Sequence, residues 1–108
     1  MNKAFGLTCA VLVGLSLSGC LGHTPSHEAF VAQSSSMVGN SIHVLRGMYS
    51  SPPLSIKQLP NGNMEEERIA GYGNRDRCRE FYEYDPRTSI IVGWRFEGSK
   101  ADCISVAP

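Results

Sequence analysis

The sequence lacks net charge and is short of histidine. Its 108 residues hold ten basic side chains, ten acidic side chains and three histidines. A neutral chain has no long-range field that would attract nucleic acid or an anionic membrane, so neither is expected as an electrostatic partner. The length also excludes a second domain, because a chain of this size buries only one small core.

The scarcity of histidine argues against catalysis. A serine nucleophile needs a base and an orienting group, and His43 is the only histidine in the expected folded domain. His23 and His27 stand four residues apart, but Pro25 between them disfavours the helix that would place both on one metal ion. We therefore expect no enzyme activity, catalytic residue, metal site, cofactor or small-molecule substrate.

One long apolar run stands at the start of the chain. It begins near Phe5, behind the positive charge of Lys3, and ends in Leu17-Ser18-Gly19-Cys20. These are the parts of a cleavable export signal. Because the last position is a cysteine, the segment resembles the lipobox of bacterial lipoproteins. That resemblance implies that residues 1–19 are a signal peptide and that Cys20 is the acylated, palmitate-type first residue of the mature chain. An ordinary signal peptide or an uncleaved anchor is the alternative.

The same resemblance implies a location. Leu21 follows the cysteine, where an aspartate retains such lipoproteins at the inner membrane. We therefore expect a protein anchored by its lipid to the outer membrane and facing the periplasm. Residues 20–36 are mostly small and polar without a sustained apolar period, which predicts a flexible tether. Residues 37–108 would then form the domain.

Two cysteines remain in that domain, Cys78 and Cys103. An exported chain meets oxidising conditions, so the pair is expected to form a disulfide. A loop of this length would stabilise the fold by about 3.5 kcal/mol in the chain-entropy model. The alternative interpretation is a catalytic thiol.

Hydrophobic patterns in the domain predict an α+β fold. Ser41 is a good N-cap for a short helix whose apolar side is formed by Ile42, Val44, Leu45, Met48 and Tyr49 and built around Val44, Leu45 and Met48. Turn residues such as Asn-Gly separate the segments expected as strands, which are residues 54–59, 64–72, 78–84 and 89–97. We expect one or two short helices packed on an antiparallel meander of three to four strands.

Alternation along the last strand assigns its two faces. The set Ile90, Val92, Trp94 and Phe96 is expected in the core. The opposite face would carry Ile91, Gly93, Arg95 and Glu97. The run Glu65–Glu67 is expected at an exposed sheet edge, since three consecutive acids are hard to bury. Asp76, Glu80 and Asp85 are expected to be solvated charges rather than an acid–base pair.

Several short segments resemble one family of outer-membrane lipoproteins. The residues that carry the resemblance are Val38-Gly39-Asn40-Ser41, the helix after them, Ser51-Pro52-Pro53 and Leu59-Pro60-Asn61-Gly62. They are similar to the SmpA/OmlA (BamE-like) family, although Asn40 stands where Met is usual and Ser51 where Gly is usual. The resemblance implies a helix packed on an antiparallel sheet and work by protein contact. The family's best-known member helps to insert β-barrel proteins into the outer membrane.

The expected function is therefore a non-catalytic binding or assembly module with an unidentified envelope protein as its partner. Its contact surface is predicted on the sheet face away from the helix and on the loop over residues 73–79. Arginine often carries binding energy, and an exposed isoleucine suits an apolar interface centre, so the candidate residues are Arg77, Ile91 and Arg95. A periplasmic inhibitor or immunity-type lipoprotein is one alternative. A small structural component of an envelope-spanning secretion or conjugation apparatus is the other.

Overall fold

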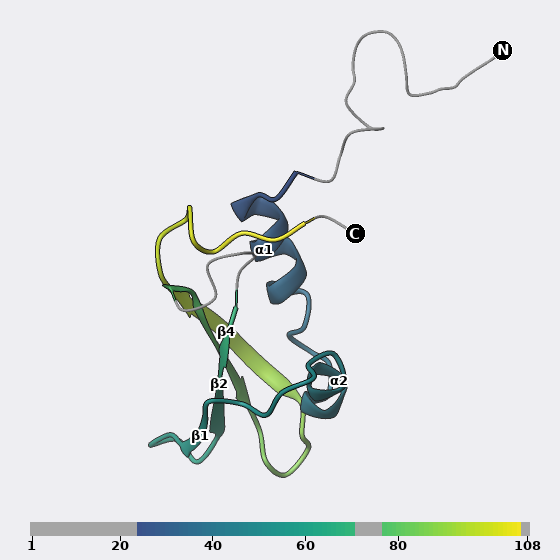
Figure 1. Ribbon diagram of the computed structural model, residues 1–108. Coiled ribbons are helices and arrows are strands. Elements are labelled where there is room, and N and C mark those ends of the chain that lie inside the picture. The colour runs from purple at the N-terminus through teal and green to yellow at the C-terminus, as the bar shows by residue number, and fades with distance from the viewer. Residues whose placement is uncertain (1–23, 71–76, 107–108) are drawn as a thin grey trace, which may run out of the picture.

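The computed structural model describes residues 24–70 and 77–106 and shows two short helices followed by four strands (Figure 1). The sheet is an antiparallel meander in the order β1-β2-β3-β4. The predicted α+β fold is therefore confirmed. The elements are α1 (His27–Ser35), α2 (Ile42–Gly47), β1 (Ser55–Gln58), β2 (Met64–Ile69), β3 (Arg79–Tyr84) and β4 (Ile91–Glu97).

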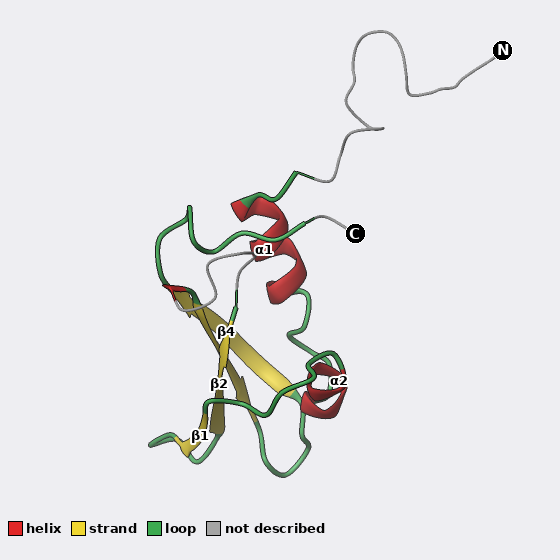
Figure 2. Ribbon diagram, in the orientation of Figure 1, coloured by secondary structure: helices red, strands yellow, loops and turns green. Residues whose placement is uncertain are grey.

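Both helices cover the same face of the sheet (Figure 2). Helix α2 places Ile42 and Leu45 against Tyr82 and Tyr84 of β3. Helix α1 places Phe30 near Trp94 and Phe96 of β4, with ring centroids 5.8 and 5.7 Å apart. Trp94 packs against both clusters, which confirms its predicted place in the core. We call this the inner face and the opposite one the outer face.

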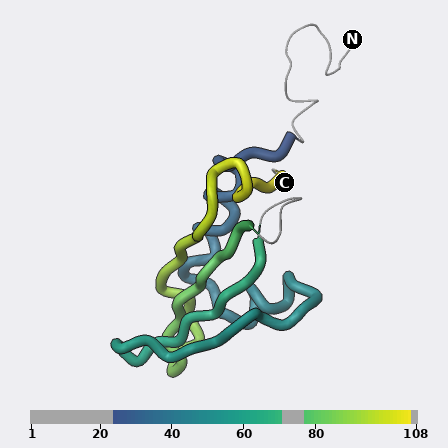
Figure 3. The backbone as a smooth tube through the Cα atoms, turned by 60° about the vertical axis from the view of Figure 1, so that its left-hand side comes forward, coloured from purple at the N-terminus to yellow at the C-terminus, as the bar shows by residue number. Residues whose placement is uncertain are grey.

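Helix α1 occupies part of the expected tether. Ser26 caps it by accepting a hydrogen bond from the Ala29 amide, and Phe30 is buried. Ser26 also forms an isolated β-bridge with Ser105, and the C-terminal segment runs beside α1 (Figure 3). The prediction of a flexible tether over residues 20–36 is thus wrong for residues 27–35. Their weak apolar pattern forms a helix because Phe30 packs into the core.

The side of α2 that is buried differs from the predicted one. Ser41 is the N-cap, as expected, and accepts from the His43 amide. Ile42 and Leu45 are buried, whereas Val44 is 53% exposed and Met48 is 68% exposed. The prediction is right for Ile42 and Leu45 and wrong for Val44 and Met48. Residues 42 and 45 stand one turn apart on one side, and Val44 and Met48 share the other.

A β-bulge changes the faces of β4. Glu83 pairs with Gly93 but Tyr84 pairs with Ile91, so Val92 has no partner on β3. The bulge reverses the alternation at its N-terminal side. Ile91 is therefore only 1% exposed and belongs to the core, while Val92 and Ile90 are exposed. The predicted core set is right for Trp94 and Phe96 and wrong for Ile90 and Val92.

Strand β2 is an inner strand, paired on both sides by β1 and β3. The prediction that Glu65–Glu67 forms an exposed edge is therefore wrong. Glu65 lies on the outer face and Glu66 on the inner face, and both are buried. Burial of two adjacent acids requires partners, and each has an arginine, as described below.

The predicted disulfide is present. Cys78 and Cys103 are joined by an S–S bond of 2.12 Å, and both residues are fully buried beside Phe30. Gly98 makes the return of the chain possible: its φ is +136°, and a Cβ there would lie 2.5 Å from the Arg77 carbonyl oxygen. The bond ties the C-terminal tail to the start of β3.

Candidate functional site

The outer face of the sheet is a lattice of ion pairs. The Arg95 guanidinium lies 3.8 Å from the ring centroid of Phe81 and donates to Glu65 and Glu97 at 3.2 and 2.8 Å. Its hydrogen bond with Glu65 raises the pKa of Arg95 further. Arg79 pairs with Glu67 in the same way. Most charged groups of this face are therefore paired within the described chain, although Arg79 Nε is buried without a hydrogen-bond partner.

The predicted binding residues do not form one surface. Arg77 is exposed, and Arg95 lies on the outer face, as expected. Ile91 is buried against Tyr82 and Tyr84 on the inner face, so its prediction as an exposed contact residue is wrong. The bulge at Val92 is the physical reason. Residues 73–76 of the predicted contact loop lie outside the described residues.

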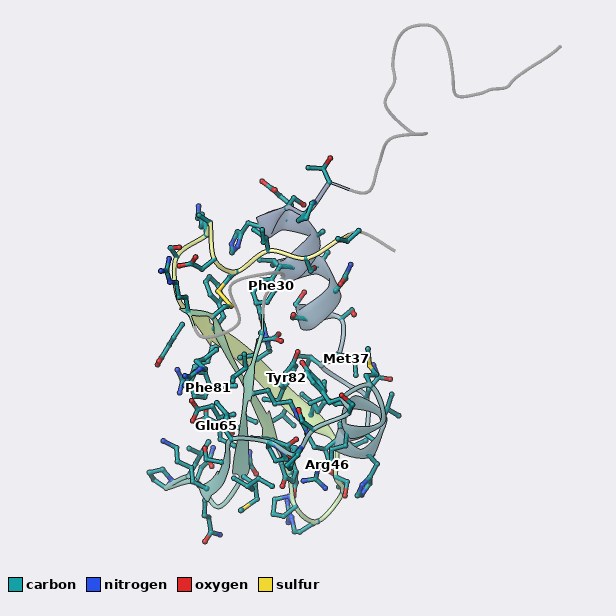
Figure 4. The ribbon with its side chains drawn as sticks, viewed as in Figure 1. Phe30, Met37, Arg46, Glu65, Phe81 and Tyr82 are labelled. Atoms are coloured by element: carbon teal, nitrogen blue, oxygen red, sulfur yellow. A yellow bond between two sulfur atoms is a disulfide. The ribbon has the colours of Figure 1, made fainter. Side chains whose placement is uncertain are left out.

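The inner face is only partly covered, and a cavity of about 320 Å³ remains between α1, α2 and the sheet. Its size falls in the range of known ligand pockets, about 300–1,000 Å³. In Figure 4, Phe30, Met37 and Tyr82 lie on the helix side of the sheet, whereas Glu65 and Phe81 lie on the other side. The lining residues are Phe30, Gln33, Ser34, Met37, Leu45, Met48, Tyr49, Ile69, Ala70, Glu80, Tyr82 and Ser105.

A buried carboxylate lies in the wall of this cavity. Glu80 is 3% exposed, so the prediction that it is solvated is wrong. Its Oε1 accepts from the Tyr82 hydroxyl at 2.8 Å and from Trp94 Nε1 at 2.9 Å. Its Oε2 accepts from the Tyr49 hydroxyl at 3.2 Å. Burial, followed by the charge of Glu80, raises the pKa of Tyr49 and of Tyr82, so both phenols remain protonated donors.

A second buried carboxylate, Glu66, lies on the same face and is fully paired. Arg46 donates to its Oε1 from Nε and Nη2 at 3.0 and 2.8 Å. Arg68 donates to its Oε2 at 2.9 and 2.6 Å. The Arg68 guanidinium also lies 4.3 Å from the Tyr49 ring centroid and donates to the Ser51 carbonyl. The two arginines nearest the cavity wall are thus engaged by Glu66 and its neighbours.

Sequence reasoning missed the cavity because its lining comes from separate segments between Phe30 and Ser105. One signal was available for Glu80. It alternates with Tyr82 and Tyr84 along β3, and residues that alternate in a strand share a face. A carboxylate on the same face as two core tyrosines is expected to be buried, and a buried carboxylate needs donors.

Within residues 24–70 and 77–106, no three His, Cys, Asp or Glu side chains gather closely enough to hold a metal ion. Neither of the two described helices is long and apolar enough to cross a membrane. Comparisons with protein-family models, curated proteins and solved structures found no match. The resemblance to the SmpA/OmlA family therefore stays a prediction.

Proposed function

We propose that this chain is an outer-membrane lipoprotein that faces the periplasm and acts as a non-catalytic protein-binding or assembly module, in the manner of the SmpA/OmlA family. The lipobox-like segment ending at Cys20 supports the anchor. The buried disulfide agrees with export, because such bonds persist in oxidising compartments. The observation that carries the proposal is the cavity that the two helices leave open on the inner face.

The inner face suits a partner better than the outer face does. On the outer face, Arg79 and Arg95 are in ion pairs with glutamates, so a partner would have to break existing ion pairs. On the inner face, the cavity is lined mostly by apolar side chains. One part of its lining is polar and buried, around Glu80, and its rim is exposed. An interface centre of this kind accepts an anchor side chain from a partner. The proposed contact surface is therefore the cavity and its rim.

Helix α2 supplies the apolar part of that rim. Met48, the C-cap of α2, lines the cavity and is largely exposed, and Val44 is exposed within the helix. Methionine adapts its shape to different contacts, which suits a binding rim. Nothing within the described chain covers these side chains, so a partner would bury them.

In vivo cross-linking tests the proposal. Photo-reactive side chains at the rim positions 33 and 48 should capture an envelope protein in living cells, and membrane-assembly proteins are the expected class. Position 87, in the exposed turn between β3 and β4, is the matched control and should capture none. Equal capture at all three positions, or at none, would contradict the proposal. Capture at position 95 alone would indicate that the outer face is the contact surface. Capture of a muramidase would favour the inhibitor function.

A further inference from the structure

We infer that the cavity binds the ammonium group of a lysine side chain from a protein partner, with Glu80 as its counter-ion. This inference depends on the proposed function in one respect only, which is that the partner is a protein. Three features of the cavity carry it: the absence of an ion-pair partner at Glu80 within the described residues, the hydrogen-bonding capacity left in its wall, and the apolar surface around it.

Glu80 has no ion-pair partner among the described residues. In the part of the chain that the structure describes, every ion pair involves other acids. Arg68 stands opposite Glu80 in the register of β2 and β3, but it donates to Glu66, as Arg46 does. Glu80 is held by neutral hydroxyl and indole donors alone. Because no cation donates to Glu80 directly, a cation that enters the cavity gains a charge-assisted hydrogen bond there.

The cavity wall beside Glu80 retains hydrogen-bond acceptors. An ionised carboxylate has about four acceptor sites, and three donors already point at Glu80. The hydroxyl hydrogens of Tyr49 and Tyr82 are both directed at the carboxylate, so these oxygens face other groups as acceptors. The wall therefore offers acceptors and negative charge. An ammonium has three donors and no acceptor, which matches it.

The geometry favours lysine over arginine. Oε1 of Glu80 already accepts two hydrogen bonds, so only Oε2 has room for another strong donor. A guanidinium binds a carboxylate best through both oxygens at once, and that arrangement is blocked here. The apolar walls suit the four-carbon stem of lysine, which packs on apolar surface while its charge finds a partner. These walls are formed by Phe30, Met37, Leu45, Met48, Ile69 and Ala70.

The test uses the full chain in detergent micelles, labelled with ¹⁵N at tryptophan. The chain has a single tryptophan, and its indole N–H donates to Glu80, so one NMR signal reports on the site. The probe is Nα-acetyl-lysine N-methylamide, and the control probe is the norleucine analogue, which lacks the ammonium. We expect a saturable shift with the lysine probe and binding at least about tenfold weaker with norleucine, the usual loss for a hydrogen bond to a charged group.

Variants decide whether Glu80 is responsible. Glu80→Gln should abolish the preference for lysine over norleucine. The matched control is Glu83→Gln, on the same strand but the outer face, where the carboxylate accepts from Asn61 and Asn63; the preference should persist. Equal binding of the two probes to the native chain would overturn the inference. An unchanged preference in folded Glu80→Gln would do the same.

A further variant covers the case in which Glu80→Gln does not fold. Ala70→Leu narrows the cavity without changing Glu80, so it should abolish binding of the lysine probe, and retained binding in a folded variant would contradict the site. These probes are small molecules added to the purified chain. Their failure would therefore remove the lysine site while the cross-linking result still decides the proposed function.

Discussion

At the scale of single residues, two buried carboxylates on the inner face have different roles. Glu66 is fully buried and receives two charge-assisted hydrogen bonds on each oxygen from Arg46 and Arg68. Glu80 receives neutral donors only and lines a cavity. A group whose charge is balanced inside the fold acts structurally. A buried carboxylate to which no cation donates, beside an open cavity, has a charge-assisted hydrogen bond left to make.

Glu66→Gln tests the structural role. The substitution leaves Arg68, which is almost fully buried, with no negative partner, and breaking such a buried pair costs about 3–5 kcal/mol. The free energy of unfolding, measured by urea denaturation of the oxidised protein, should fall by that amount. Glu97→Gln is the control, because Glu97 is largely exposed and its pair with Arg95 contributes less than about 1 kcal/mol. Equal losses in the two variants would contradict the role given to Glu66.

The burial of Glu65 and Glu66 could not be predicted from the local sequence. Three consecutive glutamates indicate an exposed edge only when no arginines can reach them. Arg46 lies 20 residues from Glu66 in sequence, and Arg95 lies 30 residues from Glu65. The fold brings both arginines to β2. Pairing over such separations depends on strand order and side-chain direction. Neither can be read from the local pattern around Glu65 and Glu66.

At the scale of elements, the bulge in β4 explains one error and α1 explains another. A strand with strict alternation would bury Val92 on the same face as Trp94. Because Val92 is unpaired in the bulge, the residues before it exchange faces, and Ile91 is buried instead. The N-cap Ser41, the Asn-Gly turn and the strand positions were predictable because their signals are local. Helix α1 was not, because its stability depends on the contacts of Phe30 with β4 and the disulfide.

Phe30→Ala tests whether α1 belongs to the domain. Phe30 is 2% exposed and contacts the aromatic rings of Trp94 and Phe96, so emptying its volume should cost about 3–5 kcal/mol. Thermal unfolding of the purified protein measures the loss. Ala32→Gln, at an exposed position of the same helix, should change stability by no more than about 0.5 kcal/mol. If residues 27–35 were a flexible tether, neither substitution would change the unfolding temperature.

At the scale of the whole molecule, the disulfide joins the C-terminal segment to the start of β3. Cys78 and Cys103 are 25 residues apart in sequence, and a loop of that length is worth about 3.5 kcal/mol in the chain-entropy model. The tail beyond Cys103 then reaches α1 through the Ser26–Ser105 bridge and the Gln33 contact with Val106. One covalent bond thus holds together the start of β3, the C-terminal segment and the first helix.

Reduction should accordingly lower the thermal midpoint by about 15–30 °C, because a loss of 1 kcal/mol shifts the midpoint of a small domain by about 4–8 °C. Differential scanning calorimetry with and without reductant measures this shift. The double variant Cys78→Ser with Cys103→Ser is the control, since its midpoint should not respond to reductant. Alkylation of both thiols in protein isolated without prior reduction would show that the bond is not formed in the cell.

The last prediction concerns the attachment of the whole molecule, which lies outside the described residues and depends on the lipobox-like sequence. Because α1 begins at His27 and its cap is Ser26, only six residue steps separate the cap from Cys20. A chain of that length spans at most about 20 Å, so a lipid on Cys20 would hold the cavity close to the membrane. Mass spectrometry of the membrane-bound protein should give residues 20–108 plus a diacylglycerol and a further acyl chain. Cys20→Ala should give the uncut, unlipidated chain, and an unmodified Cys20 in the native protein would remove the anchor from the proposed function.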